Sequence, residues 1–213
     1  MATAIGYLRV SSTAQAKDGK DGFPRQRAAI RAYCTGKRIE LLKEAVPQVR
    51  RIAVLARPEH AGEPRERRVS EDAARKLGIS SVYLPLSDAV GIDAVLPAIA
   101  KERCDAIVVF PDGVMVNQGE RIARFAAGLR VPAISGWASF AENGFLLTYG
   151  PHLSETYRAL GRFVDRILRG AKPSELPVEL PRRVELVVNL RTAKSLGVTI
   201  PQSVLVRADR VIE

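Results

Sequence analysis

The stretch Asp105-Ala-Ile-Val-Val-Phe110 is an unbroken apolar run behind a single acidic residue. A strand covered on one face only alternates apolar and polar residues, so an unbroken run favours a strand buried on both faces, as in a parallel sheet. Working outward from it, short apolar runs alternate with helix-like segments. The expected strands are Arg51–Ala56, Val82–Leu86 and Val131–Ser135, and the expected helices are Glu66–Leu77, Ile92–Lys101 and Gly119–Leu129. This βαβα order predicts an α/β fold, a Rossmann-like parallel sheet with helices on both faces.

The two ends of the chain follow a less regular pattern. At the front, Ile5–Val10 is strand-like, a helix is expected to open at Pro24, and Arg38–Leu42 is expected to be a second strand. The elements expected after residue 135 are a strand over Gly144–Gly150, an amphipathic helix over Leu153–Leu168, a strand over Val184–Asn189, and short helices beginning near Thr192 and Pro201. The regular alternation is therefore confined to the middle of the chain.

The composition is that of a soluble globular protein, with 46% hydrophobic and 26% charged residues. No apolar run approaches the roughly 20 residues that span a bilayer, so no membrane insertion is expected. The first residues lack the pattern of a secretory signal, and the chain as written is expected in the cytoplasm. Residues 1–44 contain nine Lys/Arg and four Asp/Glu, which is half of the net charge of +10. This density suits a phosphate-binding surface, and it equally suits a basic, solvated helix face.

Cysteine and histidine residues are few and widely spaced. Cys34 and Cys104 are the only cysteines, and we expect both to be free thiols, because a secreted disulfide scaffold would contain more of them. His60 and His152 are isolated in the sequence, without the spacing of a metal site. We therefore expect neither a metal nor a cofactor.

The second part of the chain resembles a known family. The stretches that carry the resemblance are Leu147-Thr-Tyr-Gly-Pro151, Val164-Asp-Arg-Ile-Leu-Arg-Gly-Ala-Lys-Pro173, Leu176-Pro-Val-Glu179 and Glu185-Leu-Val-Val-Asn-Leu-Arg-Thr-Ala-Lys-Ser-Leu-Gly197. In this order they look like the C-terminal half of the ABC-type solute-binding proteins, a group that includes tryptophan- and aromatic-amino-acid-binding members. The resemblance runs from about Val49 to Glu213. It implies a domain over residues 47–213 with the fold of one lobe of a type I periplasmic binding protein, a family that works in the periplasm or otherwise outside the cytoplasm.

In a parallel sheet, ligands bind beyond the carboxyl ends of the strands. The ligand-binding candidates at the expected strand ends are Arg57, Asp112, Gly113, Trp137 and Tyr149. Asp112 is the candidate partner for a ligand ammonium group, and Trp137 for an apolar wall or a stacking face. Three of them also have a structural alternative: Asp112 as a helix N-cap, Trp137 as core or lobe-interface packing, and Tyr149 as a lid on the turn at Gly150.

The first part of the chain resembles a different family. Tyr7-Leu-Arg-Val-Ser-Ser-Thr-Ala-Gln15, followed by Gly22-Phe-Pro-Arg-Gln26, looks like the start of a serine recombinase of the resolvase/invertase type. The resemblance implies that Ser11 would attack a DNA phosphodiester and that Arg9 would hold the phosphate. The later recombinase motif Asp…Ser-Gly…Asp-Arg-Pro is missing from this sequence, and charge on a transferring phosphoryl group must be neutralised by several cations. We therefore expect residues 1–46 to be a truncated fragment without activity through Ser11.

Three classes of function follow. The first is a non-enzymatic solute-binding component of an ABC-type uptake system, or a remnant of one, with an amino acid as the candidate small-molecule ligand. The second is a DNA-binding or recombinase-related protein that uses Ser11, with weak nonspecific binding to DNA. The third is a regulator in which a small-molecule lobe controls a DNA-binding front, and a recombined gene product without activity is a further alternative. Besides the solute, we expect as partner either a second copy of the chain, through an apolar patch over Val184–Val211, or a separate first lobe.

Overall fold

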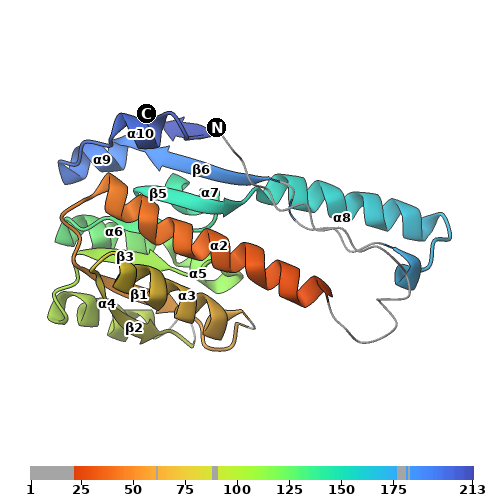
Figure 1. Cartoon of the computed structure of the whole chain (residues 1–213), viewed down its shortest axis with the longest axis horizontal. Coiled ribbons are helices and arrows are strands. Elements are labelled where there is room, and N and C mark those ends of the chain that lie inside the picture. The colour runs from red at the N-terminus through yellow and green to blue at the C-terminus, as the bar shows by residue number, and fades with distance from the viewer. Residues whose placement is uncertain (1–21, 61, 88–90, 177–180, 182) are drawn as a thin grey trace.

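A computed structural model describes residues 22–60, 62–87, 91–176, 181 and 183–213, with the backbone alone for residues 22–32 and 174. The described residues form a seven-stranded sheet with the strand order β2-β1-β3-β4-β5-β6-β7 (Figure 1). The strands are β1 (Arg51–Ala56), β2 (Ser80–Pro85), β3 (Ala106–Val109), β4 (Ala133–Ser135), β5 (Leu147–Pro151), β6 (Val184–Asn189) and β7 (Arg210–Ile212). The helices are α2 (Gly22–Ala45), α3 (Glu63–Lys76), α4 (Ile92–Lys101), α5 (Gly113–Asn117), α6 (Gly119–Leu129), α7 (Ala138–Glu142), α8 (Leu153–Leu168), α9 (Leu190–Leu196) and α10 (Gln202–Leu205), with a 3-10 turn η1 (Pro173–Glu175).

Neighbouring strands of the sheet run parallel except for β5 and β6, which are antiparallel. The predicted α/β fold is confirmed, with this one reversed pair added to a mostly parallel sheet. The reversal follows from the connection between the two strands. The chain leaves the sheet at the end of β5, runs outward through α8 and re-enters at the same edge, so β6 must run back along β5.

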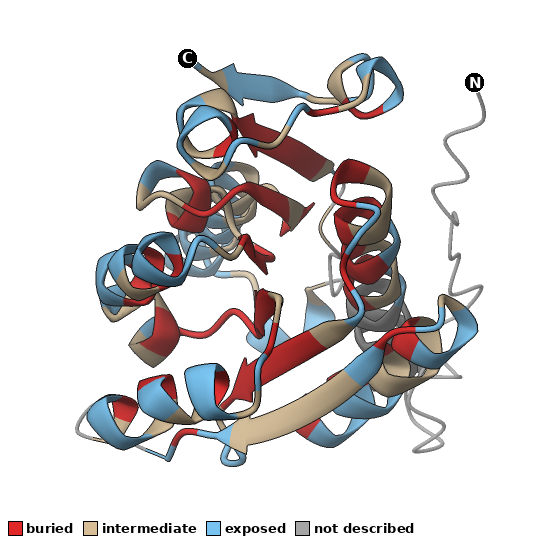
Figure 2. Ribbon diagram, turned by 90° about the vertical axis from the view of Figure 1, so that its left-hand side faces the viewer, coloured by how far each residue is buried: buried red, intermediate tan, exposed pale blue. Residues whose placement is uncertain are grey.

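Helices cover both faces of the sheet. Successive side chains of a strand point to opposite faces, so each strand contributes to two apolar clusters. In β1, Ile52 and Val54 belong to a first apolar cluster, which includes residues of α2, α9 and α10. Ala53 and Leu55 belong to a second cluster, which includes residues of α4, α5, α6 and α7. Figure 2 shows the buried strands lying between these two helical layers.

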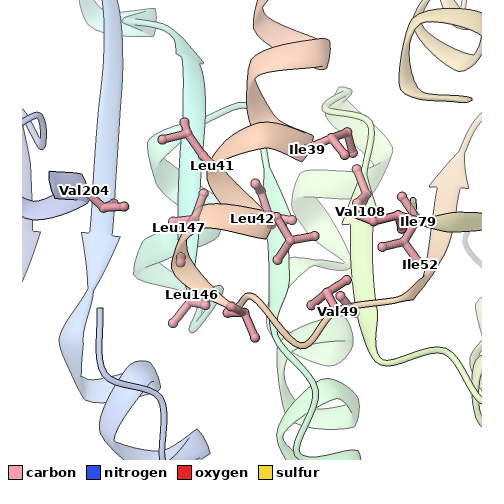
Figure 3. Packing of buried hydrophobic residues seen from close by; sticks show 14 of the residues in the cluster. Ile39, Leu41, Leu42, Val49, Ile52, Ile79, Val108, Leu146, Leu147 and Val204 are labelled. Carbon is pink, nitrogen blue, oxygen red and sulfur yellow. The ribbon is translucent and has the colours of Figure 1, made fainter. Parts of the chain in front are cut away.

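Helix α2 occupies the place where we expected a strand over Arg38–Leu42, so that prediction is wrong. Ile39, Leu41 and Leu42 are all buried in the first cluster (Figure 3). A helix brings Leu41 and Leu42 to the sheet together, whereas a strand would point them to opposite faces. The predicted domain boundary at residue 46 lies at the end of this helix, whose second half packs in the same core as β1.

Most of the other predicted elements are present. The bounds of β1, α4, α6, α8 and β6 agree with the predictions, whereas α5, α7 and β7 were not predicted. The expected strand Ile5–Val10 lies outside the described residues. The stretch Val184–Val211, predicted as an apolar patch, is largely covered: β6 is buried from Glu185 to Asn189, and the exposed large apolar residues of the stretch are Val206 and Val211. Within the described part of the chain, no helix is both long and apolar enough to cross a bilayer.

Candidate functional site

The carboxyl ends of β1, β3, β4 and β5 lie along one edge of the sheet, because these strands are parallel neighbours. We call this the carboxyl-end edge. Arg57 follows β1 directly, Asp112 and Gly113 come shortly after β3, and Trp137 comes shortly after β4. Tyr149 lies inside β5. The predicted ligand-binding residues are therefore all at or near the edge where open α/β sheets bind their ligands.

Asp112 is held by two contacts. Its Oδ1 accepts a hydrogen bond of 2.8 Å from the backbone N–H of Met115, which caps the N-terminus of α5. Its Oδ2 lies 3.9 Å from Nε of Arg57. The cap, which we gave as the structural alternative for Asp112, is confirmed, and its role toward a ligand stays a prediction.

Arg57 joins the ends of two neighbouring strands through its charge. Its Nε lies 3.9 Å from Oδ2 of Asp112, which comes after β3, and 3.7 Å from Oε2 of Glu59. The Arg57 side chain keeps 26% of its surface exposed, whereas the Asp112 side chain keeps 10%. The edge thus presents a partly exposed cation beside a carboxylate that is nearly covered.

Gly113 and Trp137 lie at the N-termini of two short helices, α5 and α7, which pack in the second cluster. Gly113 is the first residue of α5, and a Cβ atom built on it would meet nothing within 4 Å, so the space beside it is open. Trp137 precedes α7, is partly buried and packs against the second cluster, which contains Phe140. Packing against the core, the alternative for Trp137, is therefore confirmed for part of its side chain, and the ligand role stays a prediction.

Tyr149 lies on the other face of the sheet, beneath α2. Its side chain packs against the first cluster, and its backbone carbonyl accepts a 3.0 Å hydrogen bond from Nε of Arg38. Burial, together with the neighbouring Tyr33 and Cys34, raises the pKa of the Tyr149 hydroxyl. The structure therefore brings Arg57 and Asp112 together, but it does not place the Tyr149 ring on the face that carries them.

Arg38 is a buried cation at this edge that the sequence analysis did not identify as a site residue. Its side chain is 2% exposed, and its Nη2 would lie 3.0 Å from a Cβ atom on Gly136, at the end of β4. Its Nη1 has no hydrogen-bond partner among the described residues. Burial lowers the pKa of Arg38, and the buried Glu66 carboxylate opposes that shift. The signal for this residue was the four-residue spacing of Cys34, Arg38 and Leu42, which sets all three on one helix face.

The ends of β4 and β5 approach each other closely at two glycines. A Cβ atom on Gly150 would lie 2.1 Å from the carbonyl oxygen of Gly136, and a Cβ atom on Gly136 would lie 2.7 Å from Cγ of Pro111. No side chain fits in either place. The absence of side chains here allows the two backbones, and the Arg38 guanidinium beside them, to pack together.

Other candidates from the sequence do not join the edge. Cys34 and Cys104 are buried free thiols, and burial raises the pKa of both. Across the described ranges, no group of three or more His, Cys, Asp or Glu side chains could hold a metal ion. Ser11 and Arg9, the residues of the recombinase alternative, lie outside the described residues.

The fold and the edge together define the class of protein, an α/β lobe with charged and aromatic side chains at the carboxyl ends of its parallel strands. The model of the family of ABC transporter substrate binding proteins matches residues 32–212. The chain therefore belongs to the ABC transporter substrate-binding protein family. No curated protein matches the chain.

Solved structures share this fold. A conserved domain protein from Vibrio cholerae is 28% identical with a TM-score of 0.76, over 83% of this chain and 60% of that one. A domain from Streptococcus pneumonia, solved in complex with L-Trp, is 24% identical with a TM-score of 0.77, over 84% of this chain and 60% of that one. A substrate-binding protein with adhesive properties from Clostridium difficile is 20% identical with a TM-score of 0.61, over 83% and 59%. The chain thus spans about 60% of the length of these proteins.

Proposed function

We propose that the chain is the solute-binding component of an ABC-type uptake system and that it holds a free amino acid at the carboxyl-end edge. The observation that carries this proposal is the Arg57–Asp112 pair, with its 3.9 Å separation, at the ends of two adjacent parallel strands. The L-Trp bound by the pneumococcal structure supports the choice of ligand class.

The charges of the pair match those of an amino acid. A zwitterionic amino acid presents an ammonium group and a carboxylate, and charge-assisted hydrogen bonds to both are the strong ones. In the proposed arrangement Asp112 accepts from the ammonium group and Arg57 donates to the carboxylate. Trp137, which is partly buried beside α7, supplies an apolar surface for the amino-acid side chain. The open space at Gly113 leaves room for the ligand backbone.

The expected affinity is modest. A ligand pocket normally buries most of its ligand, and the carboxyl-end edge contacts a ligand from one side only. If a complete binder reached nanomolar affinity, about −12 kcal/mol, half of that free energy corresponds to a Kd of tens of micromolar. Ordering of side chains on binding weakens it further.

The fluorescence of Trp137, the only tryptophan, tests the proposal. We would titrate leucine, phenylalanine and other non-indole amino acids to millimolar concentrations while exciting tryptophan selectively. We expect a saturable change in emission for at least one of them. A flat response from a folded sample over the whole series would contradict the proposal.

Asp112→Asn separates the ligand role from the cap. Asparagine caps helices as well as aspartate does, so α5 should stay intact while the carboxylate charge is lost. Loss of a hydrogen bond to a charged group costs about 1.5–3 kcal/mol, so we expect Kd to rise roughly 10- to 100-fold. Asp72→Asn, which removes the same charge from the last turns of α3, is the matched control and should bind like the unchanged chain. Equal binding by both variants would remove Asp112 from the site.

A further inference from the structure

The edge of the sheet opposite the carboxyl-end edge is strongly basic. There the chain enters β1, β2, β3 and β4, which are neighbours in the sheet. The four entering segments (residues 46–51, 75–80, 101–106 and 129–133) contain seven Lys/Arg and two Asp/Glu. Five of these cations are exposed and have no ion pair in the part of the chain that the structure describes. We call them the amino-end row: Arg50, Lys76, Lys101, Arg103 and Arg130.

The two acidic residues of these segments do not neutralise the row. Glu102 pairs with the side chain of Arg51. Asp105 accepts hydrogen bonds of 2.9 Å from the backbone N–H groups of Arg50 and Arg51. At the carboxyl-end edge, in contrast, Arg57 has two carboxylates within 4 Å. The positive charge of the amino-end row is therefore directed to solvent and is free to attract an anionic partner.

Two members of the row have a backbone conformation that the fold would fill better with glycine. Arg103 and Arg130 lie just after α4 and α6 in the left-handed region, with φ of 52° and 55°. Glycine adopts this region without strain, as Gly78 does just after α3, with φ of 68°. Attraction to the helix dipole explains cations in a last helical turn, such as Lys76 and Lys101. It gives less reason for two arginines on strained backbone, so their side chains point to a role outside the fold.

We propose that the amino-end row binds anionic lipid headgroups, so that the lobe rests on a bilayer by this edge while the carboxyl-end edge faces away from it. Neighbouring strands lie about 4.8 Å apart, so the row extends in a line across the ends of four strands and presents its charges to a flat surface. Clusters of about four to eight Lys/Arg are typical of segments that bind anionic lipids. The row is charged and solvated, so nothing in the fold requires another part of a protein to cover it.

A nucleic acid would offer phosphates too, but the edge lacks the other features of such a site. Single-stranded nucleic acids stack their bases on aromatic side chains. Across the described ranges, the exposed aromatic side chains are Tyr33 and Tyr157, which lie on α2 and α8, outside the four segments. A duplex is read by an element that enters a groove, whereas this edge consists of helix ends and short loops. Membership of an ABC transporter family, which works beside a membrane, also favours a lipid surface.

Cosedimentation of the full chain with lipid vesicles tests this inference. The vesicles are phosphatidylcholine with or without about 30% phosphatidylglycerol. We expect binding to the anionic vesicles only, and weaker binding when NaCl is raised from about 0.1 to about 0.5 M, because salt screens the charges. Arg103→Gly combined with Arg130→Gly removes two charges of the row and suits the left-handed backbone. Each cation near an anionic surface strengthens binding roughly fivefold, so this variant should bind about 25-fold more weakly.

Arg65→Gln combined with Arg68→Gln is the matched control, because it removes the same charge from exposed positions near the start of α3. Arg68 lies about 12 Å along the helix from Lys76, beyond the Debye length of about 10 Å at 0.1 M salt, so we expect a change below about threefold. Circular dichroism checks that both variants fold.

Failure to bind anionic vesicles, or equal weakening by the two double variants, would overturn the inference. Binding to duplex DNA that depends on Arg103 and Arg130, without binding to vesicles, would overturn the choice of lipid and assign the row to a nucleic acid. The vesicle assay does not depend on whether the chain binds an amino acid, so it and the fluorescence titration fail separately.

Discussion

At the scale of single residues, the carboxyl-end edge depends on two glycines that leave no room for a side chain. The backbones of β4 and β5 meet where a Cβ atom on Gly150 would lie 2.1 Å from the carbonyl oxygen of Gly136. A backbone oxygen cannot swing aside as a flexible side chain can. The ends of both strands must therefore move if a larger residue replaces Gly150.

Gly150→Ala should destabilise the protein for this reason. Forcing extra volume into a packed region costs about 1–3 kcal/mol or somewhat more, and we expect the upper part of that range. Gly161→Ala is the control: it lies within α8, its Cβ atom would meet nothing within 4 Å, and alanine favours a helix by roughly 0.5–1 kcal/mol. Urea unfolding of both variants measures the difference, and an unchanged midpoint for Gly150→Ala would contradict the close contact.

Part of the site could be predicted from the sequence residue by residue. Arg57, Asp112, Gly113 and Trp137 follow apolar runs, and in a parallel sheet the ends of those runs meet at one edge. Pairing of Arg57 with Asp112 could not be predicted, because it depends on β1 and β3 being neighbours although β2 lies between them in the sequence. Arg38 was missed because residues 38–42 were interpreted as a strand. That interpretation gave no reason to expect Arg38 to be buried beside Gly136.

At the scale of elements, the second half of α2 belongs to the core of the lobe. Ile39, Leu42 and Val46 pack in the same cluster as Val54 of β1. The family match begins at residue 32, which places this half of the helix inside the family region as well. The sequence interpretation failed here because a five-residue apolar pattern fits a strand and a buried helix segment equally, and the burial of both Leu41 and Leu42 decides for the helix.

Leu42→Ala tests whether α2 contributes to the stability of the fold. Leu42 is fully buried, and truncating such a residue costs about 2–5 kcal/mol through lost burial and the cavity left behind. The same substitution at Leu129, which is 37% exposed at the end of α6, should cost much less. Chemical unfolding at equal protein concentration compares them. Equal stabilities would mean that α2 is not part of the cooperative core.

The elements that the sequence did not predict are short or depend on tertiary contacts. Helices α5 and α7 are single turns next to glycine and tryptophan, without enough residues to show a helical period. Strand β7 is three residues long and is defined by its pairing with β6. In contrast, α4, α6 and α8 were predicted with the correct bounds because each is long enough for its apolar residues to repeat.

At the scale of the whole molecule, the described chain combines one buried sheet with one exposed helix. The two clusters on the faces of the sheet account for the buried core, and α8 extends away from them (Figure 1). The candidate site and the start of α8 lie at the same edge of the sheet, since α8 begins where β5 ends.

Backbone amide chemical shifts measured during an amino-acid titration test the central claim, that solute binds at the carboxyl-end edge. Four glycines serve as local probes: Gly113 and Gly136 lie at this edge, whereas Gly78 and Gly128 lie at the C-terminal ends of α3 and α6, near the amino ends of the strands, at the opposite edge of the sheet. With leucine or phenylalanine at millimolar concentration, we predict that the Gly113 and Gly136 amides and the Trp137 indole shift saturably, while Gly78 and Gly128 stay in place. Shifts that appear at Gly78 and Gly128 instead, or no shifts with any amino acid of the series, would contradict it.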